Sequence, residues 1–355
     1  MSFEWWRALN TVERLERGLA DKSGGNDALG AERLEKLIRQ YDLREFEEHL
    51  SVYLSSLGID RATYQRILNQ DEESVRPPKP DWAQAVDNAL RMFRWTSRPS
   101  TFRSFAEPFV HYANDQMKKT LIKNDLFCRI IENETFDETI SPFLPGTNLE
   151  SNIIVECTPT LVLLINEIAE ESNTLKKDAA PINGLLDKIQ DLSYYTQLFN
   201  RFPVLAKKIG QTVLSSLESS LDMCVNFFRD RVDIIGLLVS EECGNVVRIE
   251  AAGDSHRRGR TVRQLSFESG EKIFYKPRSA KINKEYNKLL ERIRHLLPRD
   301  LIPGVPSYIW NEGDCHYWEA DVVGRPCKSE NEIRLFYERV GALLAIAYCL
   351  GSSDL

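Results

Sequence analysis

The chain has 355 residues, more than one domain usually contains, so we expect two domains or one domain with a large appendage. Hydrophobic residues make up 42% and charged residues 28% of the chain, a globular composition that excludes disordered, collagen-like and disulfide-scaffold proteins. The 46 Lys and Arg residues against 53 Asp and Glu residues give a net charge of −7, which argues against nucleic-acid or anionic-membrane binding by the whole surface. Any function that needs positive charge must therefore depend on a local cluster of basic residues.

The cysteines and the first residues of the chain predict a cytoplasmic protein. The seven cysteines are odd in number and widely spaced, without a CxxC pair or a Cys–His cluster, so we expect reduced thiols and no metal site. The N-terminus lacks the basic and apolar stretches of a secretory signal. The longest apolar runs, 161–165 and 342–350, fall short of the roughly 20 residues of a membrane span, so we expect no transmembrane segment. The sequence leaves the oligomeric state open.

Hydrophobic residues recur every three or four positions through the first part of the chain, which predicts a helical region over 1–230. One such stripe consists of Phe46, Leu50, Tyr53, Leu54 and Leu57. Prolines and glycines interrupt the helical pattern near 76–80, 141–148 and 176–184. Residues 204–228 are expected to form one long amphipathic helix.

After residue 230 the hydrophobic period changes from about 3.6 residues to 2, which predicts strands. Three strands are expected at 246–251, 261–267 and 271–276. The last two are joined by Ser269 and Gly270, a pair that favours a tight hairpin turn. The remaining elements are expected to be a helix over 281–297, strands at 306–310 and 316–320, and a helix over 330–350.

This order of elements is that of the N-lobe of a protein kinase running into its C-lobe. We therefore predict an α+β fold with a helical region at 1–230, a kinase-like N-lobe with an antiparallel sheet at 231–325, and the first helix of a C-lobe at 326–355. In such a lobe, backbone N–H groups of the loop between the first two strands cover nucleotide phosphates, and a lysine on the third strand neutralises their charge. Here the loop begins at Gly253, and the lysine is Lys276.

The loop by itself is a weak signal for phosphate binding. Gly253 and Gly259 enclose five residues, so the loop has neither the GxGxxG spacing nor the Walker A spacing, and a strand follows it. A charged hairpin loop without a ligand explains the same residues. Asp254 and His256 face the same way in an extended segment and could form an acid/base pair, although aspartate after glycine is also common in turns.

Lys276 is the stronger candidate, because it ends a strand with an alternating pattern and directly precedes Pro277. The alternative is an ordinary exposed lysine. A kinase lysine needs a carboxylate partner on the following helix. On a helical wheel Glu285 lies roughly 80° from the centre of the apolar stripe and Glu291 roughly 160°, so Glu285 is the expected partner. Equally, Glu285 could simply complement the positive end of its helix.

A local excess of positive charge surrounds these residues. Between Asp254 and Arg299 there are 13 Lys and Arg residues against 5 Asp and Glu residues. This concentration suits an anion such as ATP or a phosphorylated substrate, although a solvated basic face is the default for a run of charges. Aromatic residues are not interleaved on a sheet face as in RNA-recognition domains, so nucleic acid is not an expected partner.

Three strings together resemble the dehydratase part of the class II lanthipeptide synthetases, the LanM family. They are Gly253-Asp254-Ser255-His256, Tyr275-Lys276-Pro277-Arg278-Ser279, and the run from Gly341 to Tyr348 that continues into Gly351-Ser352-Ser353-Asp354-Leu355. The stretch Phe202-Pro203-Val204-Leu205-Ala206 is similar to the family as well. The resemblance therefore covers at least residues 200–355.

The resemblance implies a lipid-kinase-like fold, a two-step reaction and a peptide substrate. Members of the family use ATP and Mg²⁺ to phosphorylate Ser and Thr of a ribosomally made precursor peptide, and then eliminate phosphate to give dehydroalanine or dehydrobutyrine. A separate C-terminal cyclase domain, which binds Zn²⁺, forms the thioether rings. By position, Lys276 would hold ATP phosphates, Asp254 and His256 would assist elimination, and Asp354 would serve phosphoryl transfer.

One departure from the family concerns the end of the sequence. In the family a histidine, an asparagine and a metal-binding aspartate follow the Asp-Leu pair, whereas this sequence ends at Leu355. A kinase site lies between two lobes, so we expect the isolated chain to be inactive and its C-lobe to be truncated. The alternatives are a kinase-like phosphotransferase for a lipid or small molecule, and a non-catalytic peptide-binding module built from the first 230 residues.

Overall fold

The computed structural model describes residues 3–16, 33, 43–69, 79–124, 127, 135–171, 179–253, 260–296, 301–302, 306–311, 313 and 315–351. The chain divides into two compact units. The first contains Met1–Tyr112 and Leu149–Leu214, and the second contains Ala113–Asn148 and Ser215–Leu355. Residues 113–148 and 215–230 thus belong with the sheet, whereas the predicted boundary at 230 assigns them to the helical region. They do so because they supply part of the core beneath that sheet.

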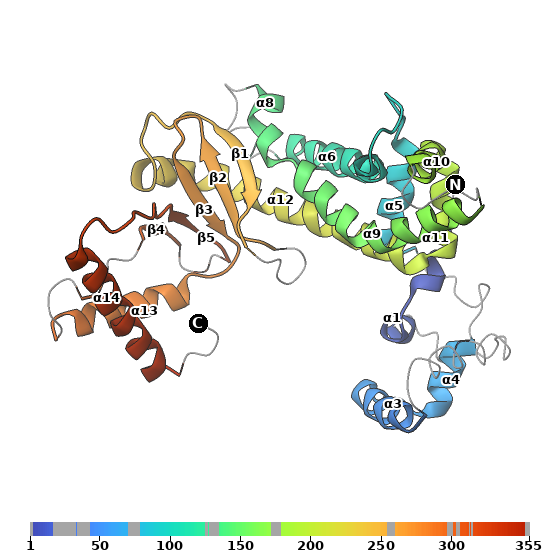
Figure 1. The fold of residues 1–355 in the computed structure, drawn as a ribbon, viewed down its shortest axis with the longest axis horizontal. Helices are drawn as coiled ribbons and strands as arrows, with labels where there is room; N and C mark the ends of the chain where they lie inside the picture. The colour runs from blue at the N-terminus through green and yellow to red at the C-terminus, as the bar shows by residue number, and fades with distance from the viewer. Residues whose placement is uncertain are drawn as a thin grey trace. The chain divides into compact units, whose positions relative to one another are not determined.

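The first unit is helical. Its described helices include α1 (Thr11–Glu16), α3 (Leu43–Leu57), α4 (Arg61–Asn69), α5 (Asp81–Met92), α10 (Ala179–Gln190), α11 (Leu192–Arg201) and the greater part of α9 (Gly146–Glu171), as Figure 1 shows. The beginnings of α6 (Glu107–Ile122) and α12 (Pro203–Leu237) also belong to this unit. Aromatic side chains fill its core, with Tyr195 stacked on Phe105 and packed edge-on against Phe199. The hydroxyl of Tyr195 donates to the backbone carbonyl of Phe105 at 3.2 Å, which satisfies this buried polar group.

The second unit contains a five-stranded antiparallel sheet in the order β1-β2-β3-β5-β4. The strands are β1 (Val246–Ala251), β2 (Arg263–Phe267), β3 (Lys272–Lys276), β4 (Tyr308–Ile309) and β5 (Tyr317–Ala320). Gly270, with φ of +88°, forms the turn between β2 and β3, as the sequence predicts for this hairpin. All five strands lie within one or two residues of their expected positions or inside them. The α+β composition is compatible with the prediction, and the kinase-like lobe stays a prediction.

One face of the sheet packs on the C-terminal part of α12 (Pro203–Leu237), which is the long helix expected over 204–228 (Figure 1). Residues of β2 alternate between the two faces, so Leu265 and Phe267 are buried against this helix. Phe227 of α12 meets Phe267 and Trp318 at ring-centroid distances of 6.3 and 5.8 Å. The short α8 (Phe136–Ile140), the 3₁₀ turn Ser141–Phe143 and part of α6 (Glu107–Ile122) complete this core.

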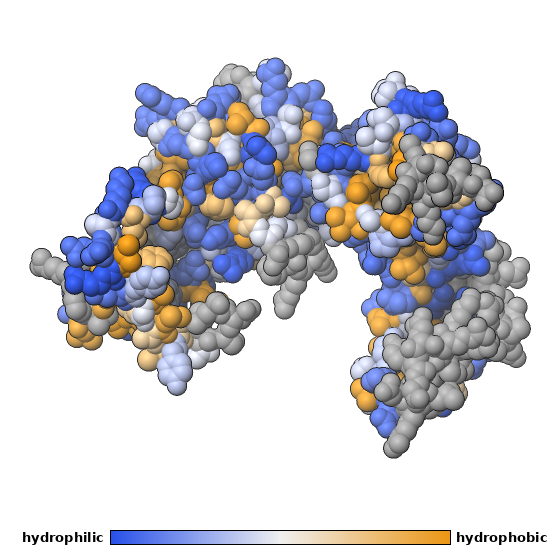
Figure 2. Space-filling model, viewed as in Figure 1, coloured by the Kyte–Doolittle hydropathy of each residue, from blue (hydrophilic) through white to orange (hydrophobic). Residues whose placement is uncertain are grey.

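Two further helices follow the strands, α13 (Lys281–Arg294) and α14 (Glu330–Cys349). The backbone N–H of Glu332 donates to the Ser329 hydroxyl at the start of α14, an N-cap that fixes where the helix begins. Hydrophobic residues at helical spacing form an apolar stripe along α14, yet no residue of α14 is buried. Phe336 and Tyr337 are 54% and 68% exposed, and hydrophobic side chains are visible over the α13–α14 region in Figure 2.

Among the described residues, one helical run over 136–171 has the length and composition of a membrane span. In the most apolar 18-residue stretch of this run, 28% is buried in the structure. A core helix of a soluble protein can have the same length and composition, so these two properties alone do not identify a membrane span. The buried residues Leu149, Ile153 and Cys157 follow each other at four-residue spacing, which is the pattern of a helix with one face in a protein core. The expected absence of a transmembrane segment stays a prediction.

Two glycines of α12 have opposite surroundings and give a test of the helix packing. A Cβ atom at Gly210 would lie 2.3 Å from the backbone oxygen of Trp82, so α5 and α12 approach too closely there for any side chain. We expect Gly210→Ala to destabilise the protein by about 1–3 kcal/mol, because overpacking forces the backbone to shift. Gly236 has no atom within 4 Å of such a Cβ, so Gly236→Ala is expected to stabilise α12 by about 0.5–1 kcal/mol. Urea unfolding of both variants measures the difference, and equal midpoints would contradict this packing.

Candidate functional site

The predicted site residues fall into two groups. Lys276, Glu285 and Gly253 lie among the described residues. Asp254, His256, Gly259 and Asp354 lie outside them, so their predicted roles stay predictions. Gly253 lies two residues after the end of β1 and has φ of +150°, a backbone conformation that favours glycine. A side chain there would meet nothing within 4 Å, so the need for glycine comes from the backbone and not from crowding.

Lys276 is the last residue of β3, and its side chain projects from the face of the sheet that does not pack on α12. Its Nζ atom donates to Oε1 of Glu319 at 2.6 Å. The side chains of Lys276 and Glu319 are 19% and 16% exposed, so the ion pair is mostly covered but still reached by solvent. Nζ also lies 5.5 Å from the ring centre of Tyr317, within the range of a cation–π contact. The lysine is therefore held in one place at the end of the central strand.

The expected partnership between Lys276 and Glu285 differs from what the structure shows. Glu285 is exposed on α13, and its carboxylate accepts a hydrogen bond from Lys288 at 2.8 Å. This bond lowers the pKa of Glu285 below its usual value. Lys276 takes its carboxylate from β5 instead, because β3 and β5 are hydrogen-bonded neighbours and Glu319 lies diagonally across from it. Glu319 lies 43 positions after Lys276 and on a strand, so the spacing of residues along the following helix carries no signal of this contact.

Other polar groups on the same face surround Tyr317, which is fully buried. Its hydroxyl oxygen accepts a hydrogen bond from Nδ2 of Asn283 at 3.0 Å and lies 3.5 Å from a guanidinium nitrogen of Arg278. Lys284 lies over the ring of Trp310 at 5.5 Å. Cations from β3, the β3–α13 connection and α13 thus gather on the side of the sheet that carries Lys276. This accounts structurally for part of the basic excess that the sequence shows.

The face that packs on α12 carries a buried network that the sequence analysis missed. Asp230, 5% exposed, accepts hydrogen bonds from Nε1 of Trp318 at 2.9 Å and from Nε2 of His316 at 2.8 Å. The Nε atom of Arg229 donates to the other carboxylate oxygen at 2.9 Å. Asp230 belongs to α12, whereas His316 and Trp318 lie 86 and 88 positions later in the chain. No sequence spacing signals a contact over that distance.

Burial and hydrogen bonding act in opposite directions on the Asp230 carboxyl. Burial alone would raise its pKa, because it penalises the charged form. The hydrogen bonds from His316, Arg229 and Trp318 outweigh burial and lower the pKa from 3.8 to about 2. Asp230 is therefore ionised at neutral pH, and it needs its three donors to remain so inside the core.

A small cavity of about 50 Å³ lies beside this network, between α12 and the end of the sheet from which the glycine-bounded loop leaves. Its walls include Asp222, Asn226, Arg260, Tyr275 and His316. Burial raises the pKa of Tyr275 to about 12, although the hydrogen bond from Asn226 opposes that rise. Burial also raises the pKa of Asp222 above its usual value. The cavity has room for water and polar walls, but it lies on the opposite face of β3 from Lys276.

The described residues fit a nucleotide in part. Lys276, Arg278 and Lys284 supply positive charge for phosphates, and Gly253 leaves open space at the end of β1. Mg²⁺ prefers carboxylate and carbonyl oxygens. No group of three or more His, Cys, Asp or Glu side chains suited to a metal occurs within the part of the chain that the structure describes.

Two comparisons with known proteins relate the chain to known sequences. Residues 202–355 match the family described as a domain of unknown function, DUF4135. The chain is also 25% identical over 253 residues to the lacticin 481/lactococcin biosynthesis protein LcnDR2 of Lactococcus lactis subsp. lactis. That similarity covers 67% of this chain and 26% of the relative, so the chain spans about a quarter of the relative's length. The chain is thus distantly related to a lantibiotic biosynthesis protein, which supports the predicted resemblance at that coarse level.

Removing the Asp230 charge tests the buried network. Because the folded pKa of about 2 lies below the ordinary value of 3.8, Asp230 contributes stability above pH 4 that is lost as the pH falls toward 2. We expect Asp230→Asn to lower the free energy of unfolding at pH 7 by about 2 kcal/mol and to flatten the pH dependence between 4 and 2. Urea unfolding across this pH range is the measurement. The exposed Asp233 on the same helix supplies the control, Asp233→Asn, which should leave both quantities unchanged.

Proposed function

We propose that this chain is part of a lanthipeptide synthetase dehydratase. In the proposed reaction, the side-chain oxygen of a Ser or Thr of a precursor peptide loses its proton and bonds to the γ-phosphorus of ATP while the bond from that phosphorus to ADP breaks. Loss of the Cα proton and of phosphate from Cβ then leaves dehydroalanine or dehydrobutyrine. The distant relation to a lacticin 481/lactococcin biosynthesis protein supports this proposal over a kinase-like enzyme for lipids. The activity, the substrate and the partners of the whole protein all belong to the proposal.

The Lys276–Glu319 ion pair is the observation that carries the proposal. A phosphate-binding lysine must be charged, held in a defined position and open to its ligand. Nζ of Lys276 is paired at 2.6 Å with the carboxylate of Glu319, which fixes the direction of the lysine side chain, and 19% of that side chain stays exposed. In protein kinases a helix supplies the carboxylate, whereas here the neighbouring strand β5 does so. In this proposal Glu319 of β5 takes the role that a glutamate on the following helix has in protein kinases.

The remaining roles follow from the resemblance. Gly253 and Gly259 would let the loop backbone approach the phosphates, and Asp254 and His256 would assist the elimination. Asp354 would serve phosphoryl transfer to the peptide hydroxyl. When bound, Mg²⁺ would neutralise charge on the phosphates. The lipid or small-molecule kinase remains the alternative for the same lysine.

Nucleotide binding by the full chain tests the role of Lys276. We expect Lys276→Met to weaken binding of a fluorescent ATP analogue in the presence of Mg²⁺ by about 10- to 100-fold, because a charge-assisted contact to phosphate is lost while the apolar stem remains. Lys272→Met is the matched control, because Lys272 lies on the same strand and the same face but is exposed. Fluorescence anisotropy gives the affinities. Equal binding by both variants would reject the proposed phosphate contact.

A second pair of variants identifies which carboxylate supports the lysine. Glu319→Gln should weaken binding of the same ATP analogue, because the Lys276 ammonium loses the charged partner that orients it. Glu285→Gln should leave binding unchanged, because Glu285 bonds to Lys288 on the surface of α13. Anisotropy titrations of the two variants are compared directly. Weaker binding by Glu285→Gln alone would restore the helix carboxylate as the partner.

A further inference from the structure

The outer edge of β1 has no strand beside it among the described residues. β1 is the first strand in the order β1-β2-β3-β5-β4, so its inner edge pairs with β2 and its outer edge ends the sheet (Figure 1). Val247 on β1 is 54% exposed, and Ala251 at the end of the strand is exposed as well. An edge of this kind presents backbone N–H and C=O groups to any extended chain that approaches it.

The hydrogen-bond register shows which backbone groups point outward. The N–H of Ala252 donates to the carbonyl of Val262 at 2.8 Å, so this residue faces β2. Groups alternate along an antiparallel strand, so Arg248 and Glu250 also face β2, whereas Ile249 and Ala251 direct their N–H and C=O groups away from the sheet. These outward groups have the spacing that an added strand requires.

Edge strands often carry features that discourage pairing, and β1 has two of them. Its pairing with β2 is irregular between Val246 and Arg248, and Arg248 forms an ion pair with Glu250 at 2.7 Å. Both charged side chains project from one face of the strand, as residues two positions apart do. They therefore leave the outward N–H and C=O groups of the edge uncovered. The bulge lies at the start of the strand, next to a cavity.

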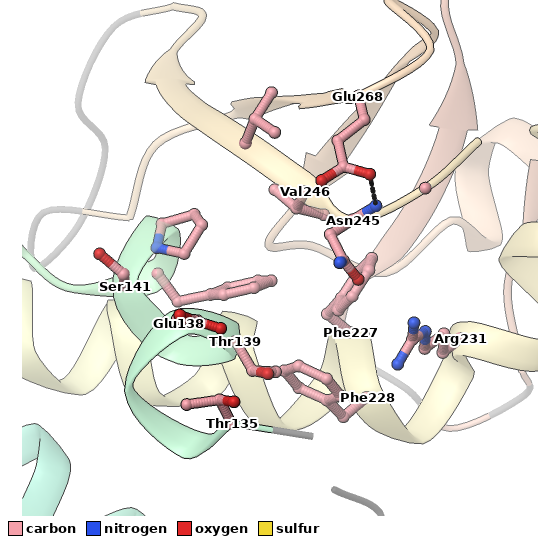
Figure 3. A pocket seen from close by; sticks show the side chains of 14 residues that line it. Thr135, Glu138, Thr139, Ser141, Phe227, Phe228, Arg231, Asn245, Val246 and Glu268 are labelled. Carbon is pink, nitrogen blue, oxygen red and sulfur yellow. Dashed lines mark hydrogen bonds between the residues drawn. The ribbon is translucent and has the colours of Figure 1, made fainter. Parts of the chain in front are cut away.

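That cavity, of about 680 Å³, lies where the start of β1 meets the 3₁₀ turn Ser141–Phe143, α8 and the end of α12 (Figure 3). Three aromatic rings, those of Phe143, Phe227 and Phe228, form its apolar wall, with ring centroids 5.2–5.6 Å apart. Polar side chains of Thr135, Thr139, Asn245 and other residues surround them. The volume of the cavity suits one bulky peptide side chain together with the residues on either side of it. An apolar wall with a polar rim is typical of a binding site.

The upper wall of the cavity is fixed before any ligand arrives. Glu268 accepts a hydrogen bond from the backbone N–H of Asn245 at 3.2 Å, drawn as a dashed line in Figure 3. It also lies against Gly244, where a Cβ atom would come within 2.3 Å of its carboxylate oxygen. With Glu138 on the opposite wall, two carboxylates face one guanidinium, that of Arg231, around the cavity. The net negative rim favours an occupant with a cationic group beside its apolar one.

We infer that an extended peptide adds as a strand to the outer edge of β1 and places an apolar side chain in the adjacent cavity. Backbone hydrogen bonds to Ile249 and Ala251 would supply affinity, as in other cases of strand addition. Alternate side chains of the added strand point toward the α12 side of the sheet, where the cavity lies, and these supply specificity. A lysine or arginine next to the apolar side chain pairs with Glu138 or Glu268. The peptide is a segment of the precursor peptide, an assignment that rests on the proposed function.

The test is a selection of peptides by the full chain. A phage-displayed library of random heptapeptides is selected against the immobilised protein, because seven residues span about 23 Å, enough to follow β1. We expect enriched peptides with an apolar residue next to Lys or Arg. The best peptide is then synthesised with a fluorescent label, and its affinity for each variant is measured by anisotropy.

Two pairs of variants locate the binding. Ala251→Pro removes an outward N–H that β2 does not use, whereas the control Ala251→Ser keeps it. Ser141→Trp fills the cavity from its rim, whereas the control Glu241→Trp adds the same ring at an exposed site outside it. We expect about tenfold or greater loss of affinity for Ala251→Pro and Ser141→Trp, and less than about a twofold change for the controls. If Ala251→Pro does not fold, the affinities of Ser141→Trp and its control Glu241→Trp test the inference by themselves.

Three outcomes would overturn the inference. These are a selection that enriches no peptide, unchanged affinity in both Ala251→Pro and Ser141→Trp, and light scattering that shows a dimer dissociated by Ala251→Pro, in which case a second copy occupies the edge. Binding of the ATP analogue separates this inference from the proposed function. If the chain binds the ATP analogue but selects no peptide, only the inferred docking site is contradicted. If it selects peptides but does not bind the ATP analogue, only the proposed reaction is contradicted.

Discussion

The contact of Trp318 with α12 is the constraint on which the candidate site depends. Trp318 is fully buried, packs against Tyr275 at 4.8 Å and Phe227 at 5.8 Å, and donates to Asp230. Its neighbour Glu319 projects from the opposite face of β5, as successive strand residues do. Fixing the indole in the core therefore also fixes the carboxylate that holds Lys276 on the other side of the sheet. Packing on the α12 side of the sheet therefore positions the opposite face, which carries Lys276.

The strands and helices were largely predictable because their signals are local. The change of hydrophobic period after residue 230 located β1, β2 and β3, and the Ser269-Gly270 pair located the hairpin between them. Lys276 was also identified correctly as the end of β3, because alternation and the following proline are both visible in a few residues. The same alternation predicts which face of the sheet carries the Lys276 side chain, but it does not identify Glu319 as the partner of that side chain.

What the sequence could not provide are contacts between distant segments. Glu319 reaches Lys276 only because β5 pairs with β3, and Asp230 meets His316 only because α12 crosses beneath the sheet. Neither pair has a spacing that periodicity can detect. The division of the chain at 230 assumed that units follow the order of the sequence, whereas residues 113–148 join the sheet's core. The exposed stripe on α14 shows likewise that amphipathic pattern alone does not determine burial.

The Asp230 carboxylate joins three chemically different donors: an indole, an imidazole and a guanidinium. Two of them come from β5 or the residue before it, and the carboxylate comes from α12. The length of the Asp230 side chain therefore sets the distance between α12 and β5. A glutamate at this position would carry the same charge, but its side chain is one methylene longer and would require a larger distance between α12 and β5. Asp230→Glu would therefore keep the charge but not the geometry of the sheet.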